Sequence, residues 1–422
     1  MSSIRRLELD VIYSGQCPGH CPRKKGEMPR WNVHFDTVVQ TQNTLVVDLL
    51  AQAKALASVV RLIPIPPYIQ QRIDQLNIIR AVRGTTGIEG TELSEDEVAK
   101  IVAAAPNERV LTGNRAREEQ EVRNAERLMR YVAETVHRDR NIPVAEPLIR
   151  TFHQITTRDI DYPNNVPGHY RTFAVSAGDY VPPASGEEIS KLMARFIEWF
   201  NSGPPSSWDP AIRAIVAHFY LVSIHSFADG NGRTSRGIES YLLYQAGLTA
   251  RGFYSLANYY YRNRPEYIEM LTHVRFKSDP DLTPFVLFAL QGLVEELQSV
   301  HAQVIDAIKI ISFRDFAREQ LAVAGRLGTP AGERQLLFLL ELEEEVVSLK
   351  ALRSGKHKLS RFYKGVTTKT LTRDIHFLRE NQLIIVAGDE LRANLGIMTQ
   401  FPAQDTPTPR LRHVSASPKG RD

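Results

Sequence analysis

The chain has 422 residues, of which 43% are hydrophobic and 24% are charged. This composition excludes a mainly disordered protein and leaves room for two or three domains. The apolar runs are short and interrupted by charges, and the N-terminus MSSIRRLELDVIYSG lacks the apolar core of a signal peptide. We therefore expect a cytoplasmic protein with no membrane partner. A net charge of +4 does not by itself indicate a nucleic-acid partner.

Residues 1–43 show neither a helical nor a strand period, so we expect an irregular N-terminal segment. This segment holds the only two cysteines of the chain, Cys17 and Cys21, with His20 between them. Zinc normally takes four ligands, and neither a second Cys pair nor a close His pair follows in the sequence. We favour two free thiols over a zinc site.

Helical periodicity begins at Thr44 and pauses at the prolines of residues 64–67. Ser94 and Glu97 have the spacing of a capping box, which predicts the start of another helix. The sequence thus predicts N-terminal helices within 44–109, followed by helices over 115–138 and 145–157.

A break in the helical rhythm follows at PNNVPGHYRTFAVSAGDYVPP, residues 163–183. Its turn residues, and the alternation from Tyr170 to Ser176, predict a short β-hairpin. Asp209 followed by Pro210 predicts the N-terminus of a buried helix. Further helices are predicted over 187–201, 234–245, 259–274 and 282–311, so we expect a mainly α domain over 110–312.

Residues 328–398 read as three short helices followed by two strands around a Gly-Asp turn. This order resembles a winged helix-turn-helix, with TTKTLTRDIHFLRENQ as its recognition helix. In so mildly basic a protein we favour target docking, or contact between the subunits of a homodimer, over DNA binding. Residues 402–422 are rich in Pro, Ser and Arg, which predicts a disordered tail. The basic residues on and before the predicted recognition helix are Lys356, Lys358, Arg361, Lys364, Lys369 and Arg373.

The stretch HSFADGNGRTSR, residues 225–236, has the composition of an anion site. Gly230 and Gly232 let the backbone turn its N–H groups inward, and the following helix offers its positive N-terminal end. Arg233 and Arg236 lie three apart on that helix, so they share a face and suit two neighbouring phosphates. A P-loop is excluded, because that motif requires lysine where an arginine stands and a preceding strand where a helix is predicted.

Two more side chains of this stretch carry chemistry. Asp229 is a hard oxygen ligand of the kind that holds Mg²⁺ beside nucleotide phosphates. His225 has an ordinary pKa of about 6.5, which suits a general base, and Phe227 is an apolar pin for the loop. Taken singly, each residue has an ordinary explanation as a core histidine, a turn or a solvated helix face. Their coincidence in one short stretch favours a functional site.

At these residues the sequence resembles the Fic family, whose signature is His-x-Phe-x-Asp/Glu-Gly-Asn-Gly-Arg-x-x-Arg. PGHYRTFAVSAGDYVPP also resembles the flap hairpin of this family. The resemblance extends over about residues 110–300 and implies a mainly α fold, a Fic-type helical core with a small β-hairpin flap. All defined positions of the signature are filled, by His225, Phe227, Asp229, Gly230, Asn231, Gly232, Arg233 and Arg236.

The resemblance implies transfer of AMP from ATP to a Ser, Thr or Tyr hydroxyl of a target protein, with Mg²⁺ as cofactor. His225 would deprotonate the attacking hydroxyl, Asp229 would hold Mg²⁺, and Asn231 would orient the α-phosphate. Tyr267 would line the adenine. The other residues that would bind the phosphates of ATP are Gly230, Gly232, Arg233 and Arg236. The flap residues that would dock the target by strand addition are Tyr170, Arg171, Thr172 and Phe173.

TTGIEG, residues 85–90, resembles the inhibitory motif of the family, Ser/Thr-x-x-x-Glu-Gly/Asn. With Thr85 as its first residue, the motif implies that Glu89 binds Arg236 in place of the γ-phosphate, so the enzyme would be autoinhibited. In some family members the same glutamate positions a water that removes AMP from a modified protein, so removal is a second activity to test. Two alternatives stay open: a Fic transferase with another nucleotide donor, and a DNA-binding regulator whose core senses a nucleotide. The intact His225 favours catalysis, because a sensor needs no base.

Overall fold

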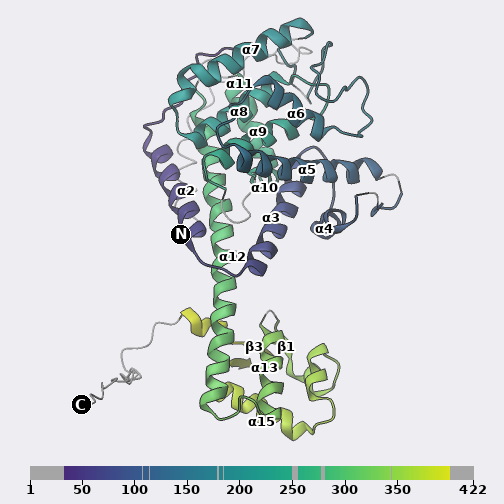
Figure 1. Cartoon of the computed structure of the whole chain (residues 1–422), viewed down its shortest axis with the longest axis vertical. Coiled ribbons are helices and arrows are strands. Elements are labelled where there is room, and N and C mark those ends of the chain that lie inside the picture. Colours follow the sequence, from purple (N-terminus) through teal and green to yellow (C-terminus); the bar gives the residue numbers. More distant parts are fainter. Residues whose placement is uncertain are drawn as a thin grey trace, which may run out of the picture. The chain divides into compact units, whose positions relative to one another are not determined.

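The computed structural model describes residues 33–399, apart from residues 107, 114, 178–179, 184, 250–254, 277–280 and 344. The chain forms two compact units, Met1–Ala302 and Gln303–Asp422, which we call unit 1 and unit 2 (Figure 1). The boundary between them falls within helix α12, Thr283–Val323. The cysteine segment and the tail at 402–422 lie outside the described residues.

Unit 1 is built from helices, and several of its predicted helix starts are confirmed. Ser94 and Glu97 form the predicted capping box, and the carboxylate of Asp209 accepts the N–H of Ala211 at the start of the next buried helix. In the described part of the chain, none of the helices is both long enough and apolar enough to cross a membrane. The helices are α2 Thr44–Leu62, α3 Pro67–Ile88, α4 Glu95–Ala103, α5 Ala116–Arg138, α6 Glu146–Thr156, α7 Glu187–Ser202, the 3-10 helix η1 Pro204–Ser207, α8 Pro210–Ile224, α9 Asn231–Gln245, α10 Ala257–Arg262 and α11 Arg264–Phe276.

Helices α8 and α9 form the centre of unit 1. Most side chains of α8 and all of those over 231–243 in α9 are buried. A helix that is buried on all sides needs packing partners on each face. Helices α3, α5, α6 and α7 pack against this pair, and Figure 1 shows it lying between α5 and α7. The loop that joins α8 to α9 is therefore positioned by the best-packed part of the molecule.

The β-hairpin predicted within residues 163–183 is present only in part. Its residues Tyr170–Ser176 form no strand, and one antiparallel bridge joins Ala177 to Tyr180. Arg171 is buried, its backbone N–H donates to the Ser226 carbonyl, and its Nε donates to the His225 carbonyl. The chain bends just after Arg171, so this residue is hydrogen-bonded to the α8–α9 loop and not to a second strand.

Other element boundaries differ from the prediction. Helix α9 begins three residues earlier than predicted, at Asn231, because Gly230 has a left-handed φ of 74° that turns the chain into the helix. The single helix predicted over 259–274 is two helices, α10 and α11, separated at Asn263. Helix α12 is longer than predicted and continues to Val323.

Unit 2 contains the end of α12, three further α-helices and a small antiparallel sheet with the strand order β1-β3-β2. The helices and the two strands predicted within 328–398 are present. The short strand β1 was not predicted, because two residues carry no period. Phe313 and Ala317 of α12 belong to the core of this unit, which explains why the unit begins before residue 328. The assignment to the winged-helix class stays a prediction. The elements are α13 Pro330–Leu342, β1 Val347–Ser348, α14 Leu349–Arg353, the 3-10 helix η2 Lys358–Tyr363, α15 Thr368–Glu380, β2 Ile384–Ala387, β3 Glu390–Ala393 and η3 Leu395–Thr399.

Candidate active site

The loop between α8 and α9 turns twice through left-handed backbone conformations. His225 ends α8 with φ 53° and ψ 55°, and Gly230 precedes α9 with φ 74°. A Cβ on Gly230 would lie 2.6 Å from Cγ2 of Thr157, so glycine is required there for space as well as for conformation. Among the described residues, the backbone N–H groups of 231–233 have no acceptor. They leave a ready site for an anion at the N-terminal end of α9.

Asn231 fixes the shape of this loop. Its Oδ1 accepts the backbone N–H of Phe227 and its Nδ2 donates to the carbonyl of the same residue, both at 2.8 Å. Phe227 is buried and stacks on the ring of His153 with a centroid distance of 3.7 Å. Phe227 thus lies where the predicted apolar pin belongs. The Nδ2 group has a second N–H, so this loop-shaping role is compatible with a contact to an α-phosphate, which stays a prediction.

His225 is held so that one ring nitrogen stays available. Its Nδ1 lies 3.3 Å from the Val222 carbonyl, the geometry of a donor, which leaves the lone pair on Nε2. Among the described residues, Nε2 has no hydrogen-bond partner. Burial, together with the nearby charges of Arg275 and Arg171, lowers the pKa of His225 to about 4. The imidazole is therefore neutral near pH 7, as a general base must be.

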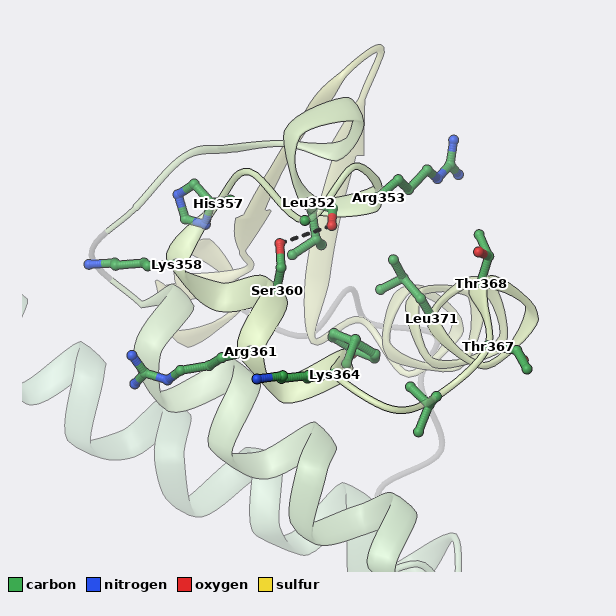
Figure 2. A pocket seen from close by; sticks show the side chains of 13 residues that line it. Leu352, Arg353, His357, Lys358, Ser360, Arg361, Lys364, Thr367, Thr368 and Leu371 are labelled. Carbon is green, nitrogen blue, oxygen red and sulfur yellow. Dashed lines mark hydrogen bonds between the residues drawn. The ribbon is translucent and has the colours of Figure 1, made fainter.

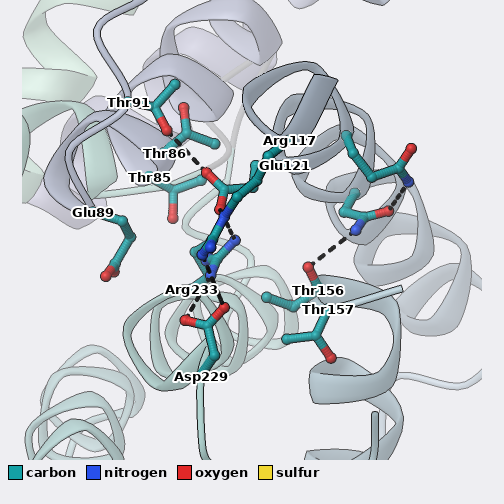
Figure 3. A network of polar contacts seen from close by, with 12 residues as sticks. Thr85, Thr86, Glu89, Thr91, Arg117, Glu121, Thr156, Thr157, Asp229 and Arg233 are labelled. Carbon is teal, nitrogen blue, oxygen red and sulfur yellow. Dashed lines mark hydrogen bonds and ion pairs between the residues drawn. The ribbon is translucent and has the colours of Figure 1, made fainter. Parts of the chain in front are cut away.

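Asp229 is neutralised by arginines. Its carboxylate lies 3.1 and 3.2 Å from Nη2 of Arg233 and 3.4 Å from Nη2 of Arg117. The buried carboxylate of Glu121 accepts from Thr91 at 2.9 Å and lies 3.3 Å from Nη1 of Arg233. Figure 3 shows Arg233 between the two carboxylates. The anion site and the segment after α3 thus share one polar network.

The donor set around Asp229 fits Mg²⁺. A single carboxylate together with substrate phosphates is a typical way to hold this ion. No group of three or more His, Cys, Asp or Glu side chains in the described part of the chain is arranged to hold a metal alone. The Asp229 side chain is 17% exposed, so a ligand at the N-terminus of α9 can reach it.

Arg236 is bound by the end of helix α3. The side chain is 1% exposed, and its Nε and Nη2 donate to Oγ1 and to the carbonyl of Thr85, each at 2.9 Å. Nη2 also lies 2.5 Å from Oε1 of Glu89. Burial raises the pKa of Glu89, but the charges of Arg236 and Arg233 outweigh it and lower the pKa overall, so this carboxylate is ionised at neutral pH.

Glu89 also covers the N-terminal turn of α9. A Cβ on Gly232 would lie only 2.2 Å from the Glu89 Oε1, so the carboxylate rests directly against the glycine backbone. The predicted inhibitory pair, Thr85 and Glu89, and the predicted anion ligand Arg236 are therefore together in space. A negative charge already occupies part of the anion site.

Tyr267 lies deeper than predicted. It is 1% exposed, its hydroxyl is 3.0 Å from Nε2 of His218, and its ring stacks on Tyr260. The other ring nitrogen of His218 lies 3.0 Å from the buried Glu239. Tyr267 is one of the groups that raise the pKa of Arg236 and thus lies next to it. In this conformation it supports Arg236 from the core, and its role in lining the adenine stays a prediction.

His153, a residue of α6 that was not predicted from the sequence, holds the α8–α9 loop in place. Its Nδ1 accepts the backbone N–H of Gly168 at 2.9 Å, so Nε2 carries the proton and donates to the Asp229 carbonyl at 3.0 Å. Burial lowers the pKa of His153 to about 4, which keeps the ring neutral. It lies 76 residues before Asp229, and no spacing rule connects the two.

The predicted flap residues lie beside the loop. Tyr170 packs on Phe227 at 5.3 Å, Arg171 binds the loop carbonyls, Phe173 is half-buried, and Thr172 is exposed. All of the predicted residues of the loop, the inhibitory motif and the flap therefore belong to one region of unit 1.

Comparisons with known proteins agree with this geometry. Residues 143–243 match the model of the Fic/DOC family. The chain is 30% identical over 204 residues to the protein adenylyltransferase Fic of Drosophila ananassae, which covers 48% of this chain and 38% of that protein. It is 28% identical over 218 residues to the protein of the same name from Culex quinquefasciatus, which covers 52% of this chain and 40% of that protein. The chain thus spans less than half the length of these curated relatives.

One solved structure shows the likeness of fold. A Fic family protein from Desulfovibrio desulfuricans aligns with a TM-score of 0.50 and 19% identity, covering 83% of this chain and 96% of that one.

Proposed function

We propose that this chain, whose residues 143–243 form a Fic domain, transfers AMP from ATP to a hydroxyl group of a target protein and is inhibited by its own Glu89. One observation carries the proposal. A neutral histidine, a free helix N-terminus and two buried arginines converge on one loop, and the carboxylate of Glu89 already binds one of those arginines.

The phosphates of ATP would bind at the N-terminal end of α9. The unpaired backbone N–H groups of 231–233 and the side chains of Arg233 and Arg236 are the donors for them. These donors are preorganised, because the arginines are buried and α9 is packed on all sides. Fixed donors in a buried site stabilise charge that develops in the transition state more strongly than water does.

His225 would act as the general base. Its Nε2 would take the proton from the target hydroxyl as the hydroxyl oxygen attacks the α-phosphorus and pyrophosphate leaves. The carbonyl of His225 accepts from Arg171, which holds this end of the loop while the reaction proceeds. Mg²⁺, when bound, would neutralise phosphate charge, and Asp229 is the residue that would hold it. Asp229 would then exchange its contacts with Arg117 and Arg233 for that role.

Glu89 would inhibit the reaction by taking the place of the γ-phosphate on Arg236. Both are anions, and the 2.5 Å contact leaves no room for a phosphate oxygen on the same Nη2. ATP would then bind in a pose in which His225 is not in line with the α-phosphorus. Residues 170–173 would receive the target, and their place beside the α8–α9 loop supports this role.

The test uses ATP labelled at the α-phosphate, with magnesium, and three proteins: wild type, Glu89→Gly, and Glu89→Gly combined with His225→Ala. We expect label on protein with Glu89→Gly alone. Absence of label from all three, while ATP still binds, would refute the transferase and leave a nucleotide sensor. Parallel reactions with UTP and CTP identify the donor. Wild type added to the labelled product tests removal, which would appear as loss of label.

A further inference from the structure

Positive charge is concentrated in one stretch of unit 2. Residues 346–379 contain nine lysines and arginines and one acidic residue, Asp374, which gives a net charge of +8, whereas the whole chain has a net charge of +4. The Asp374 carboxylate is buried and is bound by Arg334 and Gln335 of α13, so it does not face solvent. The outward electrostatic field of this stretch is therefore almost wholly positive.

The structure separates the paired cations of this stretch from the unpaired ones. Lys358 and Arg361 form ion pairs with Glu345 and Glu341 near the end of α13. The other seven are exposed and form no ion pair with any described residue, although the charges of Lys350 and Arg353 lower the pKa of the nearby Asp389. We call these seven the basic surface: Lys350, Arg353, Lys356, Lys364, Lys369, Arg373 and Arg379.

A cleft of about 410 Å³ lies within the basic surface, between α14, η2 and the N-terminus of α15. Arg353 and Lys364 are among its lining residues, and Figure 2 shows them at the cleft together with Thr367. The Thr367 side chain does not cap α15, and the N–H groups of the first two residues of that helix have no acceptor among the described residues. An uncapped helix N-terminus beside two unpaired cations is suited to a phosphate group.

The exposed face of α15 extends the same charge pattern. Lys369 and Arg373 are exposed at a spacing of four and share one face, while Leu371 and Leu378 are buried against the core. Further along this face His376 is paired with the exposed Glu380, so the positive face lies at the N-terminal end of α15. The major groove of B-form DNA admits an α-helix, whereas the major groove of A-form RNA is deep and narrow. A membrane surface would favour apolar anchors, and residues 346–379 expose two large hydrophobic side chains, Val346 and Val366, which lie 20 residues apart in sequence.

We propose that unit 2 binds duplex DNA through the basic surface, with backbone phosphates at the cleft and along α15. The small net charge of the whole chain favoured docking or dimer contact in the sequence analysis. The seven unpaired cations reverse that preference, because counterion release depends on local cations and not on net charge. The binding is independent of the transferase reaction proposed for unit 1.

The test measures binding of the full chain to a fluorescent duplex by anisotropy at several salt concentrations. Each phosphate neutralised steepens the dependence of log affinity on log salt by about 0.9, so four contacts would weaken binding by roughly a hundredfold between 50 and 200 mM. The double variant Lys364→Gln, Lys369→Gln should weaken binding about tenfold and flatten the slope by about two.

The matched control is Lys309→Gln with Arg318→Gln, which removes the same charge from α12 outside the basic surface. We expect it to bind the duplex like wild type. If the two double variants lose equal affinity for the duplex, binding depends on the net charge of the chain and not on the basic surface, and the proposal is overturned. The proposal is also overturned if wild type does not bind the duplex at 50 mM salt, whether or not it binds phosphatidylserine vesicles. Circular dichroism of both variants shows that lost binding is not lost folding.

Discussion

Replacing Glu89 by Gln tests the inhibitory contact with the smallest change in shape. The substitution removes the negative charge that lies 2.5 Å from Arg236 but keeps a side chain of the same size. A hydrogen bond to a charged group contributes about 1.5 to 3 kcal/mol. Two features of the structure place the expected loss of inhibitory binding free energy at the lower end of that range. The Glu89 side chain is 33% exposed, and Arg236 keeps both of its bonds to Thr85.

A loss of about 1.5 to 2 kcal/mol corresponds to a rise of roughly 10- to 30-fold in the initial rate of AMP incorporation. The assay is the rate of label transfer from ATP labelled at the α-phosphate, at fixed protein and magnesium. Glu92→Gln is the control, because it removes an exposed carboxylate three residues further along. If both variants retain the wild-type rate while ATP binding persists, Glu89 does not inhibit the proposed transfer of AMP.

Three further outcomes follow from the buried histidines and the polar network. In the Glu89→Gly background, kcat/KM should rise with pH through about 4 and be level from about pH 5.5 to 7.5. The reason is that its lowered pKa keeps His225 neutral and able to act as a base over this range, and a midpoint near pH 6.5 would contradict this. His153 has a folded-state pKa of about 4 and an ordinary value of 6.5, so the unfolded chain binds its proton first. The contribution of His153 to the free energy of unfolding should therefore fall by about 2 kcal/mol from pH 7 to pH 5. In urea unfolding at these two pH values, His153→Phe should lack this part of the pH dependence. Thr91→Val should lower the free energy of unfolding by about 1 to 3 kcal/mol, since the buried Glu121 loses a donor, whereas Thr91→Ser should retain wild-type stability.

The active-site loop was predictable because its chemistry is local in sequence. His225, Asp229 and Arg236 lie in one stretch, and the capping signals at Ser94 and Asp209 act over three residues or fewer. These short-range patterns were sufficient to predict most helices of unit 1 and the anion site at the start of α9.

Contacts between distant segments could not be predicted in this way. The hydrogen bond from His153 to the Asp229 carbonyl and the one from Thr91 to Glu121 depend on how helices pack. The hairpin prediction holds only in part for the same reason. Alternation does not identify the partner of a segment, and the partner of Arg171 is a loop carbonyl that no pattern in that segment indicates.

The most direct test of the account compares two labels on the same ATP. Glu89→Gly is incubated with a target lysate and magnesium, once with label at the α-phosphate and once with label at the γ-phosphate. Protein-bound label is measured above that obtained with the Glu89→Gly, His225→Ala double variant in the same lysate, because kinases of the lysate also transfer the γ-phosphate. The account predicts label from the α-position alone, because attack at the α-phosphorus expels the β- and γ-phosphates as pyrophosphate. Label from the γ-position would contradict it, since the chain would then transfer the terminal phosphate and not AMP.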